Sequence, residues 1–271
     1  KSLQTIFFRK YSYVFWYYFQ ISLKIMKGRK GIILAGGTGS RLFPITHATC
    51  KQLIPVYDKP MIYYPLTTLM LANIRDILVI TRKEDLDIFK NLLGNGDKFG
   101  IKISYKSQSQ PKGIAEALII GEDFIEESPS ALILGDNLFF GNNFVTQLEN
   151  TTKNKETTLF AYRVQDPERY GIVQFDDNKN VISLEEKPKN PLTNFAITGM
   201  YFYDSFASEK ARSLKPSKRG ELEITDLNKL YLKENNLKIE LLGRGMAWLD
   251  TGTFDSLHEA GSYIRALENR Q

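Results

Sequence analysis

Short apolar runs alternate with amphipathic segments along the first half of the chain. The runs are four to six residues long and rich in β-branched side chains, as is typical of parallel strands buried on both faces. The amphipathic segments have the length and apolar spacing of helices. This pattern predicts strands at residues 30–35, 76–81, 101–106 and 131–134, and helices at 61–71, 84–93 and 113–124.

The alternation also predicts the topology. Strand–helix units joined by right-handed crossovers place parallel strands side by side and cover both faces of the sheet with helices. We therefore expect an α/β fold of the Rossmann-like type: a three-layer α/β/α sandwich with a mixed, mainly parallel central sheet.

The second half of the chain is richer in strands. The polar stretch DDNKN lies between two apolar runs, at 171–175 and 181–185, and predicts a hairpin. Further strands are expected at 159–164, 198–203, 240–242 and 247–248, and helices at 222–233 and 254–268. Since the sequence shows no internal repeat and no long linker, we expect this half to be a smaller, sheet-rich part of one domain.

Residues 1–25 do not follow this pattern. Thirteen uncharged residues run from Tyr11 to Leu23, fewer than the roughly 20 apolar residues that span a bilayer. No small-residue cleavage site of a secretory signal follows them. Contact with a membrane surface stays open, but no stable insertion is expected. We expect residues 1–25 to be an appendage and residues 26–271 to form the domain, with Met26 as the natural start.

Charge and cysteine content narrow the class of protein. The 36 basic and 31 acidic residues give a formal net charge of +5. Acidic residues stand near most of the basic ones and arginine-rich tracts are absent, which favours a mixed-charge surface over nucleic-acid binding. Cys50 is the single cysteine, which excludes an internal disulfide and fits the cytoplasm. We expect a buried Cys50 rather than a nucleophile.

A glycine loop, GGTGSRL, follows the first predicted strand. Ligands of open α/β sheets bind beyond the carboxyl ends of the strands. Gly36, Gly37 and Gly39 would let backbone N–H groups approach phosphate oxygens. Arg41 and Lys51 could neutralise phosphate charge around the loop. A structural turn flanked by surface cations is the alternative, but the combination favours phosphate binding.

Acidic residues follow two later apolar stretches. Asp136 in LILGDNLF comes directly after a predicted strand, where a cap or an Asx turn is the alternative role. A carboxylate beside phosphates indicates Mg²⁺, and Asp250 in AWLDTG is the candidate second ligand. Glu186 and Lys187 in SLEEKP could hold a sugar hydroxyl and a phosphate, or could form a structural ion pair.

The sequence offers no evident catalytic base. Neither His47 nor His258 stands in a Ser-His-Asp or Cys-His arrangement. A phosphate monoester, with a second pKa of about 6, is already an anionic nucleophile at neutral pH. A reaction that uses it needs positioning and charge neutralisation instead of a base.

Several long motifs can be recognised in the chain: KGIILAGGTGSRLFPITHATCKQLIPVYDKPMIYYPL, ALILGDNLFFG, DPERYGIVQFD, SLEEKPKNP and GRGMAWLDTGTFDSL. They resemble the bacterial glucose-1-phosphate thymidylyltransferases of the sugar nucleotidyltransferase superfamily, and the match covers roughly residues 26–270. The resemblance implies transfer of a thymidylyl group from dTTP to α-D-glucose 1-phosphate, giving dTDP-glucose and pyrophosphate. That reaction is the first step towards dTDP-L-rhamnose. Acceptance of UTP in place of dTTP stays open.

The resemblance also implies residue roles. Catalysis would use Arg41, Lys51, Asp136, Lys187 and Asp250, with Asp136 and Asp250 as Mg²⁺ ligands and Arg219 as a further helper. The nucleotide would contact Gly36, Gly37, Gly39, Gln52, Gln108 and Gly113. The glucose would contact Asn137, Tyr170, Gly171, Glu186 and Ile197.

Two departures from the family and two rival functions bear on this hypothesis. Residues 1–25 have no counterpart, and long members continue past the end of this chain with a tail that builds subunit contacts and a regulatory site. A homo-oligomer, dimer or tetramer, is expected, but feedback regulation stays open.

A dinucleotide-dependent oxidoreductase would need the third glycine of the G-x-G-x-x-G fingerprint and an acidic residue about twenty positions after the loop. The third glycine position of that fingerprint is not filled here. A non-catalytic sensor would have lost Asp136, Asp250 or Arg41, and all three are present.

Overall fold

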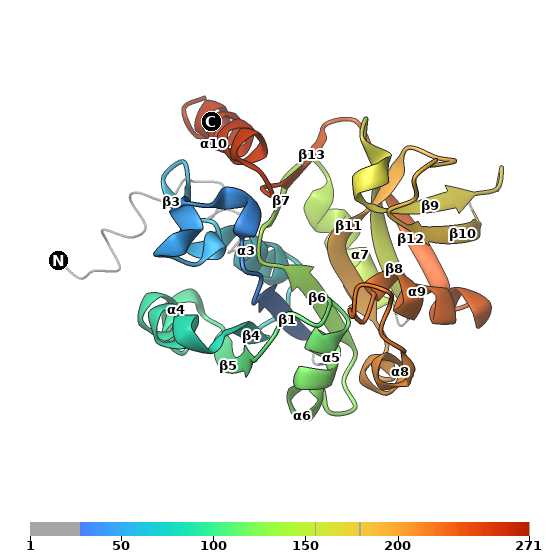
Figure 1. Ribbon diagram of the computed structural model, residues 1–271, viewed down its shortest axis with the longest axis horizontal. Coiled ribbons are helices and arrows are strands. Elements are labelled where there is room, and N and C mark those ends of the chain that lie inside the picture. Colours follow the sequence, from blue (N-terminus) through green and yellow to red (C-terminus); the bar gives the residue numbers. More distant parts are fainter. Residues whose placement is uncertain (1–27, 155, 179, 271) are drawn as a thin grey trace.

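A nine-stranded mixed sheet forms the centre of the computed structural model, which describes residues 28–154, 156–178 and 180–270 (Figure 1). The appendage expected at residues 1–25 lies outside the described residues. Four strands pair in parallel in the order β5, β4, β1, β6. They are β1 (Lys30–Ala35), β4 (Asp76–Arg82), β5 (Lys102–Gln108) and β6 (Ser130–Leu134).

The second half of the chain extends this sheet with mostly antiparallel pairs. β11 runs antiparallel to β6, β8 and β9. The expected hairpin is formed by β9 and β10, and β12 runs parallel to β8. These strands are β8 (Thr157–Arg163), β9 (Gly171–Phe175), β10 (Val181–Glu186), β11 (Phe195–Tyr203) and β12 (Leu237–Leu242). The α/β class with a mixed central sheet is confirmed.

Alternate residues of the parallel strands face two separate apolar cores. Ile33 and Val79 belong to one cluster, whereas Ile32 and Ile80 belong to the other. Both faces of the sheet are therefore buried, as the continuous apolar runs predicted. The first core takes in α3 (Tyr63–Leu71), α4 (Leu86–Leu93) and α7 (Phe144–Lys153). The second takes in α5 (Glu116–Ile120), α6 (Glu122–Ile125), α8 (Ala207–Ser213) and α9 (Ile224–Lys233).

Some helices differ from the prediction. The single helix expected at 113–124 is divided into α5 and α6 at Gly121. A Cβ on Gly121 would lie 2.8 Å from Cδ1 of Ile32, so the glycine allows close packing on β1. The sequence analysis missed α7 (FVTQLENTTK) and α8 (ASEKARS), whose residues are mostly polar and give only a weak apolar spacing. No helix in the described part of the chain is long and apolar enough to span a membrane.

Two small sheets lie beside the large one, below the carboxyl-terminal helix α10 (Phe254–Glu268) (Figure 1). One pairs β2 (Pro55–Val56) with β3 (Lys59–Pro60), and the other pairs β7 (Asn137–Gly141) with β13 (Met246–Asp250). The sequence analysis did not expect β7, because its partner comes from the far end of the chain and leaves no local pattern. This pairing brings the two halves of the chain together.

We predict that Phe160→Ala lowers the free energy of unfolding by about 3–5 kcal/mol. Phe160 of β8 is fully buried, and its ring lies 5.8 Å from that of Phe202 and 6.4 Å from that of Phe144, between centroids. Urea titration followed by circular dichroism measures the loss. Phe206→Ala, at a side chain that is 57% exposed, is the matched control and should change stability by less than about 0.5 kcal/mol.

Candidate active site

The glycine loop leaves the carboxyl end of β1 and leads into three single-turn helices, η1 (Ser40–Leu42), η2 (Ile45–His47) and η3 (Lys51–Leu53). Gly39 has φ +64, and its carbonyl accepts a hydrogen bond from Oγ1 of Thr46 at 2.9 Å. A Cβ on Gly39 would lie 3.2 Å from Cβ of Lys51, whereas one on Gly37 would meet nothing within 4 Å. The loop is therefore packed against Lys51 and open at Gly37.

The end of β5 borders the same loop. Gln108 is 5% exposed, and a Cβ on Gly36 would lie 2.5 Å from its Oε1. Nε2 of Gln108 donates to Oε2 of Glu116 at 2.5 Å, which fixes the direction of the amide. Gly113 has φ +103, and a side chain there would clash with the main chain of Leu222. Glycine is required at position 113 by both its backbone conformation and its packing.

Lys51 and Asp136 form an ion pair at the centre of the site. The distance from Nζ to Oδ2 is 2.5 Å, and the lysine side chain is 6% exposed. Oδ1 of Asp136 accepts from Nδ2 of the neighbouring Asn137 at 3.0 Å. The carboxylate thus contacts Lys51, against which the glycine loop packs.

The second expected ligand lies beside the first. In the β7–β13 ladder Asp250 is opposite Asn137, and Oγ1 of Thr251 donates to the main-chain oxygen of Asp136 at 2.9 Å. Burial, and then repulsion by the carboxylate of Asp136, raises the pKa of Asp250. Lys51 and Arg41 act in the opposite direction. The site therefore holds two carboxylates whose negative charges are only partly balanced.

This donor set fits Mg²⁺. The described residues contain no cluster of three or more His, Cys, Asp and Glu side chains that could hold a metal by themselves. Mg²⁺ is commonly bound through one or two carboxylates, with water and substrate phosphates completing its shell. A cation between Asp136 and Asp250 would also relieve their repulsion.

The guanidinium of Arg41 lies close to Gly252, a residue that the sequence analysis did not single out. Arg41 is exposed, and a Cβ on Gly252 would lie 2.9 Å from its Nη2. The guanidinium of Arg41 therefore packs against the main chain of Gly252. The signal in the sequence is the Thr-Gly pair that follows Asp250 in LDTG.

Two further side chains of the glycine-loop region are buried. Cys50 is 1% exposed, which confirms the expectation of a buried thiol, and burial raises its pKa to about 12. Sγ of Cys50 donates to Oε1 of Gln52 at 2.8 Å, and Gln52 is 3% exposed. The thiol thus holds the Gln52 amide instead of acting as a nucleophile.

Three of the five residues expected at the glucose, Tyr170, Gly171 and Glu186, lie at the β9–β10 hairpin. Gly171 pairs with Glu186, and Oε2 of Glu186 accepts from Oγ1 of Thr225 at 2.5 Å. Lys187 has φ +44, and its main-chain N–H donates to the main-chain oxygen of Tyr170 at 3.0 Å. This strained turn leaves the ammonium of Lys187 exposed, with Nζ 3.5 Å from Oε1 of Glu186.

Arg219, Ile197 and Asn137 differ in how accessible they are. Arg219 makes a bidentate pair with Glu223, with its Nη2 3.6 Å from Oε1 of Glu186. Ile197 of β11 is 7% exposed. Asn137 is 2% exposed, and its Oδ1 already accepts two hydrogen bonds. Asn137 is therefore part of the framework of the site as well as a neighbour of Asp136.

The structure thus brings the predicted residues into two adjoining groups. One group surrounds the glycine loop and the two aspartates, and the other surrounds the hairpin. Trp248, also missed by the sequence analysis, connects them, because its ring lies 5.1 Å from that of Tyr170 and it stands two residues before Asp250.

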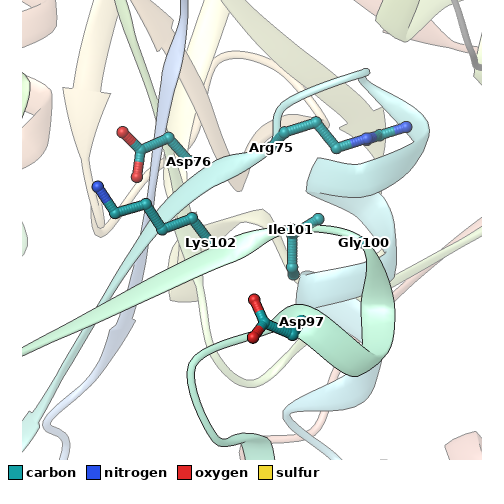
Figure 2. A pocket seen from close by; sticks show the side chains of 6 residues that line it. All are labelled: Arg75, Asp76, Asp97, Gly100, Ile101 and Lys102. Carbon is teal, nitrogen blue, oxygen red and sulfur yellow. The ribbon is translucent and has the colours of Figure 1, made fainter.

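A separate cavity lies at the opposite end of the sheet (Figure 2). It measures about 430 Å³ and is lined by Arg75, Asp76, Asp97, Gly100, Ile101 and Lys102. Asp76 and Lys102 begin the parallel strands β4 and β5, whereas the candidate site lies where parallel strands end. The cavity contains none of the expected site residues.

Known proteins share this arrangement over most of the chain. The model of the nucleotidyl transferase family matches residues 30–266. A glucose-1-phosphate thymidylyltransferase from Neisseria gonorrhoeae is 57% identical over 243 residues, which are 89% of this chain and 84% of the relative. One from Xanthomonas campestris is 54% identical over 247 residues, which are 91% and 84%.

A solved structure agrees in fold. A crystal structure of a provisionally named glucose-1-phosphate thymidylyltransferase from Bacillus anthracis, in complex with a sucrose, has a TM-score of 0.81 and 43% identity. The structural match covers 88% of this chain and 95% of the chain in that crystal structure. The chain therefore belongs to the nucleotidyl transferase family. Within that family it belongs to the glucose-1-phosphate thymidylyltransferases, which are enzymes.

We predict that Gly252→Ala weakens the binding of inorganic pyrophosphate by about tenfold, roughly 1.4 kcal/mol. The added methyl group would displace the guanidinium of Arg41 without straining the backbone, because φ of Gly252 is not positive. Isothermal titration of the full chain measures the affinity. Gly243→Ala, where a Cβ meets nothing within 4 Å, is the control, and equal binding by both variants would contradict the contact.

Proposed function

We propose that the chain transfers a thymidylyl group from dTTP to α-D-glucose 1-phosphate, giving dTDP-glucose and pyrophosphate. The observation that carries this proposal is the 57% identity to a named thymidylyltransferase over 89% of the chain. The glycine loop, the paired aspartates and the hairpin site support it, since they supply separate places for a triphosphate and a sugar phosphate.

The triphosphate lies along the glycine loop in this proposal. Gly36, Gly37 and Gly39 present main-chain N–H groups, and the open face at Gly37 leaves room for phosphate oxygens. Arg41 and Lys51 neutralise the charge that grows on the leaving pyrophosphate. Because Lys51 is already held by Asp136, little reorganisation of that cation accompanies the reaction.

Glucose 1-phosphate occupies the hairpin site. Glu186 and the main chain of Gly171 hold sugar hydroxyls, together with Asn137, Tyr170 and Ile197. Lys187 carries the exposed cation that orients the sugar phosphate. An oxygen of that phosphate attacks the α-phosphorus in line, the new P–O bond forms, and the bond to pyrophosphate breaks. No proton has to be removed from the nucleophile, so no general base is required.

Asp136 and Asp250 would hold the magnesium ion. When bound, Mg²⁺ supplies positive charge that stabilises the phosphate oxygens in the transition state. The protein contributes the fixed spacing of the two carboxylates, which the β7–β13 ladder and Thr251 impose. Arg219, beside Glu186, adds positive charge near the sugar phosphate.

The base is selected by Gln108 and Gly113, with Gln52 nearby. Thymine and uracil differ by one methyl group, which an apolar pocket distinguishes by only about 1–3 kcal/mol. The proposal therefore places dTTP first and UTP second. A cytoplasmic location, assembly into a homo-oligomer and supply of dTDP-L-rhamnose for surface polysaccharide belong to the same proposal.

The first test is release of pyrophosphate from dTTP, UTP, CTP or ATP in the presence of glucose 1-phosphate and Mg²⁺. We expect kcat/KM with dTTP to exceed that with UTP by about tenfold or more, because UTP lacks the 5-methyl group and carries a 2′-hydroxyl. CTP and ATP should react far more slowly, since their exocyclic amino groups do not match the hydrogen bonds of thymine. A preference for ATP or CTP would overturn the proposal.

Asp136→Asn should lower kcat/KM by about 10³-fold, roughly 4 kcal/mol, because a neutral amide is a poor magnesium ligand and no longer balances Lys51. The same assay measures the loss. Asp123→Asn, at a side chain of α6 that is 90% exposed, is the control and should leave kcat/KM unchanged. Near-normal turnover of Asp136→Asn would mean that the metal lies elsewhere.

A further inference from the structure

The side chain of Asn137 joins three strands inside the site. Its Oδ1 accepts from Nε1 of Trp248 in β13 at 2.6 Å and from the main-chain N–H of Gly199 in β11 at 3.1 Å. Its Nδ2 donates to Oδ1 of Asp136 at 3.0 Å. The group is 2% exposed, so these partners are not exchanged for bulk water.

Two donors decide which way this amide points. An amide oxygen accepts two hydrogen bonds, and both positions are taken by N–H groups that can only donate. A flipped amide would direct its NH₂ group at those donors and its oxygen at the carboxylate of Asp136. Burial makes such a mismatch costly. The amide therefore keeps an N–H on Asp136.

We propose that Trp248 is a positioning residue for the transfer reaction, because its indole N–H locks Asn137 and thereby orients the Asp136 carboxylate for the metal. This inference rests on the proposed function. The main-chain donor of Gly199 is fixed by the fold, so the indole is the only one of the two donors that a side-chain substitution removes. We call these three groups (Trp248, Asn137 and Asp136) the relay.

The relay complements the contact with Lys51. Lys51 holds Oδ2 of Asp136 and Asn137 holds Oδ1, so both oxygens have a defined direction before any metal binds. Outer partners of this kind commonly change metal affinity or activity by 10–100-fold when they are removed. Loss of the indole N–H should therefore affect the metal more than the sugar.

Trp248 also packs on Tyr170, which suggests a competing role as a wall of the sugar pocket. The two roles predict different results. A wall acts through the ring and changes KM for glucose 1-phosphate. The relay acts through the N–H and changes the affinity for the metal.

The experiment replaces the indole of Trp248 by its benzothiophene isostere, which keeps the bicyclic ring and lacks the N–H donor. Trp248→Phe serves as a second, genetically encoded variant. Tyr162→Phe is the matched control, since it removes a different hydrogen bond to β13, from the tyrosine hydroxyl to the main-chain oxygen of Met246. Thermal unfolding verifies that each variant is folded.

Mn²⁺ is the metal probe, titrated into the full chain with dTTP and no glucose 1-phosphate, so that no turnover occurs. Free Mn²⁺ is measured by electron paramagnetic resonance. We expect both Trp248 variants to bind Mn²⁺ about tenfold more weakly than the unmodified chain and Tyr162→Phe. The Mg²⁺ concentration for half-maximal activity should rise by a similar factor, with KM for glucose 1-phosphate unchanged in the isostere.

Unchanged Mn²⁺ affinity in the isostere would overturn the relay, as would a change confined to KM for glucose 1-phosphate. The failure of the proposed function looks different. In that case the unmodified chain would not form dTDP-glucose at all, whereas the Mn²⁺ titration would still report on the link between Trp248 and Asp136.

Discussion

The site depends on the enforced proximity of two carboxylates. Asp136 follows one strand of the central sheet and Asp250 ends a strand near the other end of the chain, yet the β7–β13 ladder places them side by side. Their repulsion contributes to the raised pKa of Asp250, whose largest cause is burial. Pairing, Thr251 and Lys51 offset this repulsion in the protein, and a divalent cation would complete the balance.

That balance explains why the neighbouring groups are buried and closely hydrogen-bonded. Lys51 at 6% exposure and Asn137 at 2% cannot follow the carboxylate if it moves, so they fix it. Gly252 leaves room for the guanidinium of Arg41 by offering no side chain. An in-line displacement between two phosphate groups requires such fixed charges, because the reaction itself needs no proton transfer from the nucleophile.

The two sheet regions then have separate tasks. The parallel half ends at the glycine loop and at Gln108, where a nucleotide can lie along main-chain N–H groups. The antiparallel half carries the hairpin of β9 and β10, with Glu186 and Lys187 at its end. β7 and β13 lie between the two regions, so this small sheet borders both groups of site residues. Trp248 and Asn137 occupy that position.

The sequence by itself determined the order of strands and helices, the parallel half of the sheet and the motifs of the glycine loop, because all of these are written in local runs of apolar side chains and glycines. It also placed Asp136 and Lys187 at strand ends. It could not supply β7 or the roles of Trp248, Thr251 and Gly252, and the local pattern left Asp250 only a candidate partner for Asp136. These depend on pairing between distant segments, and the energy of such contacts is set by the folded geometry instead of by neighbouring residues.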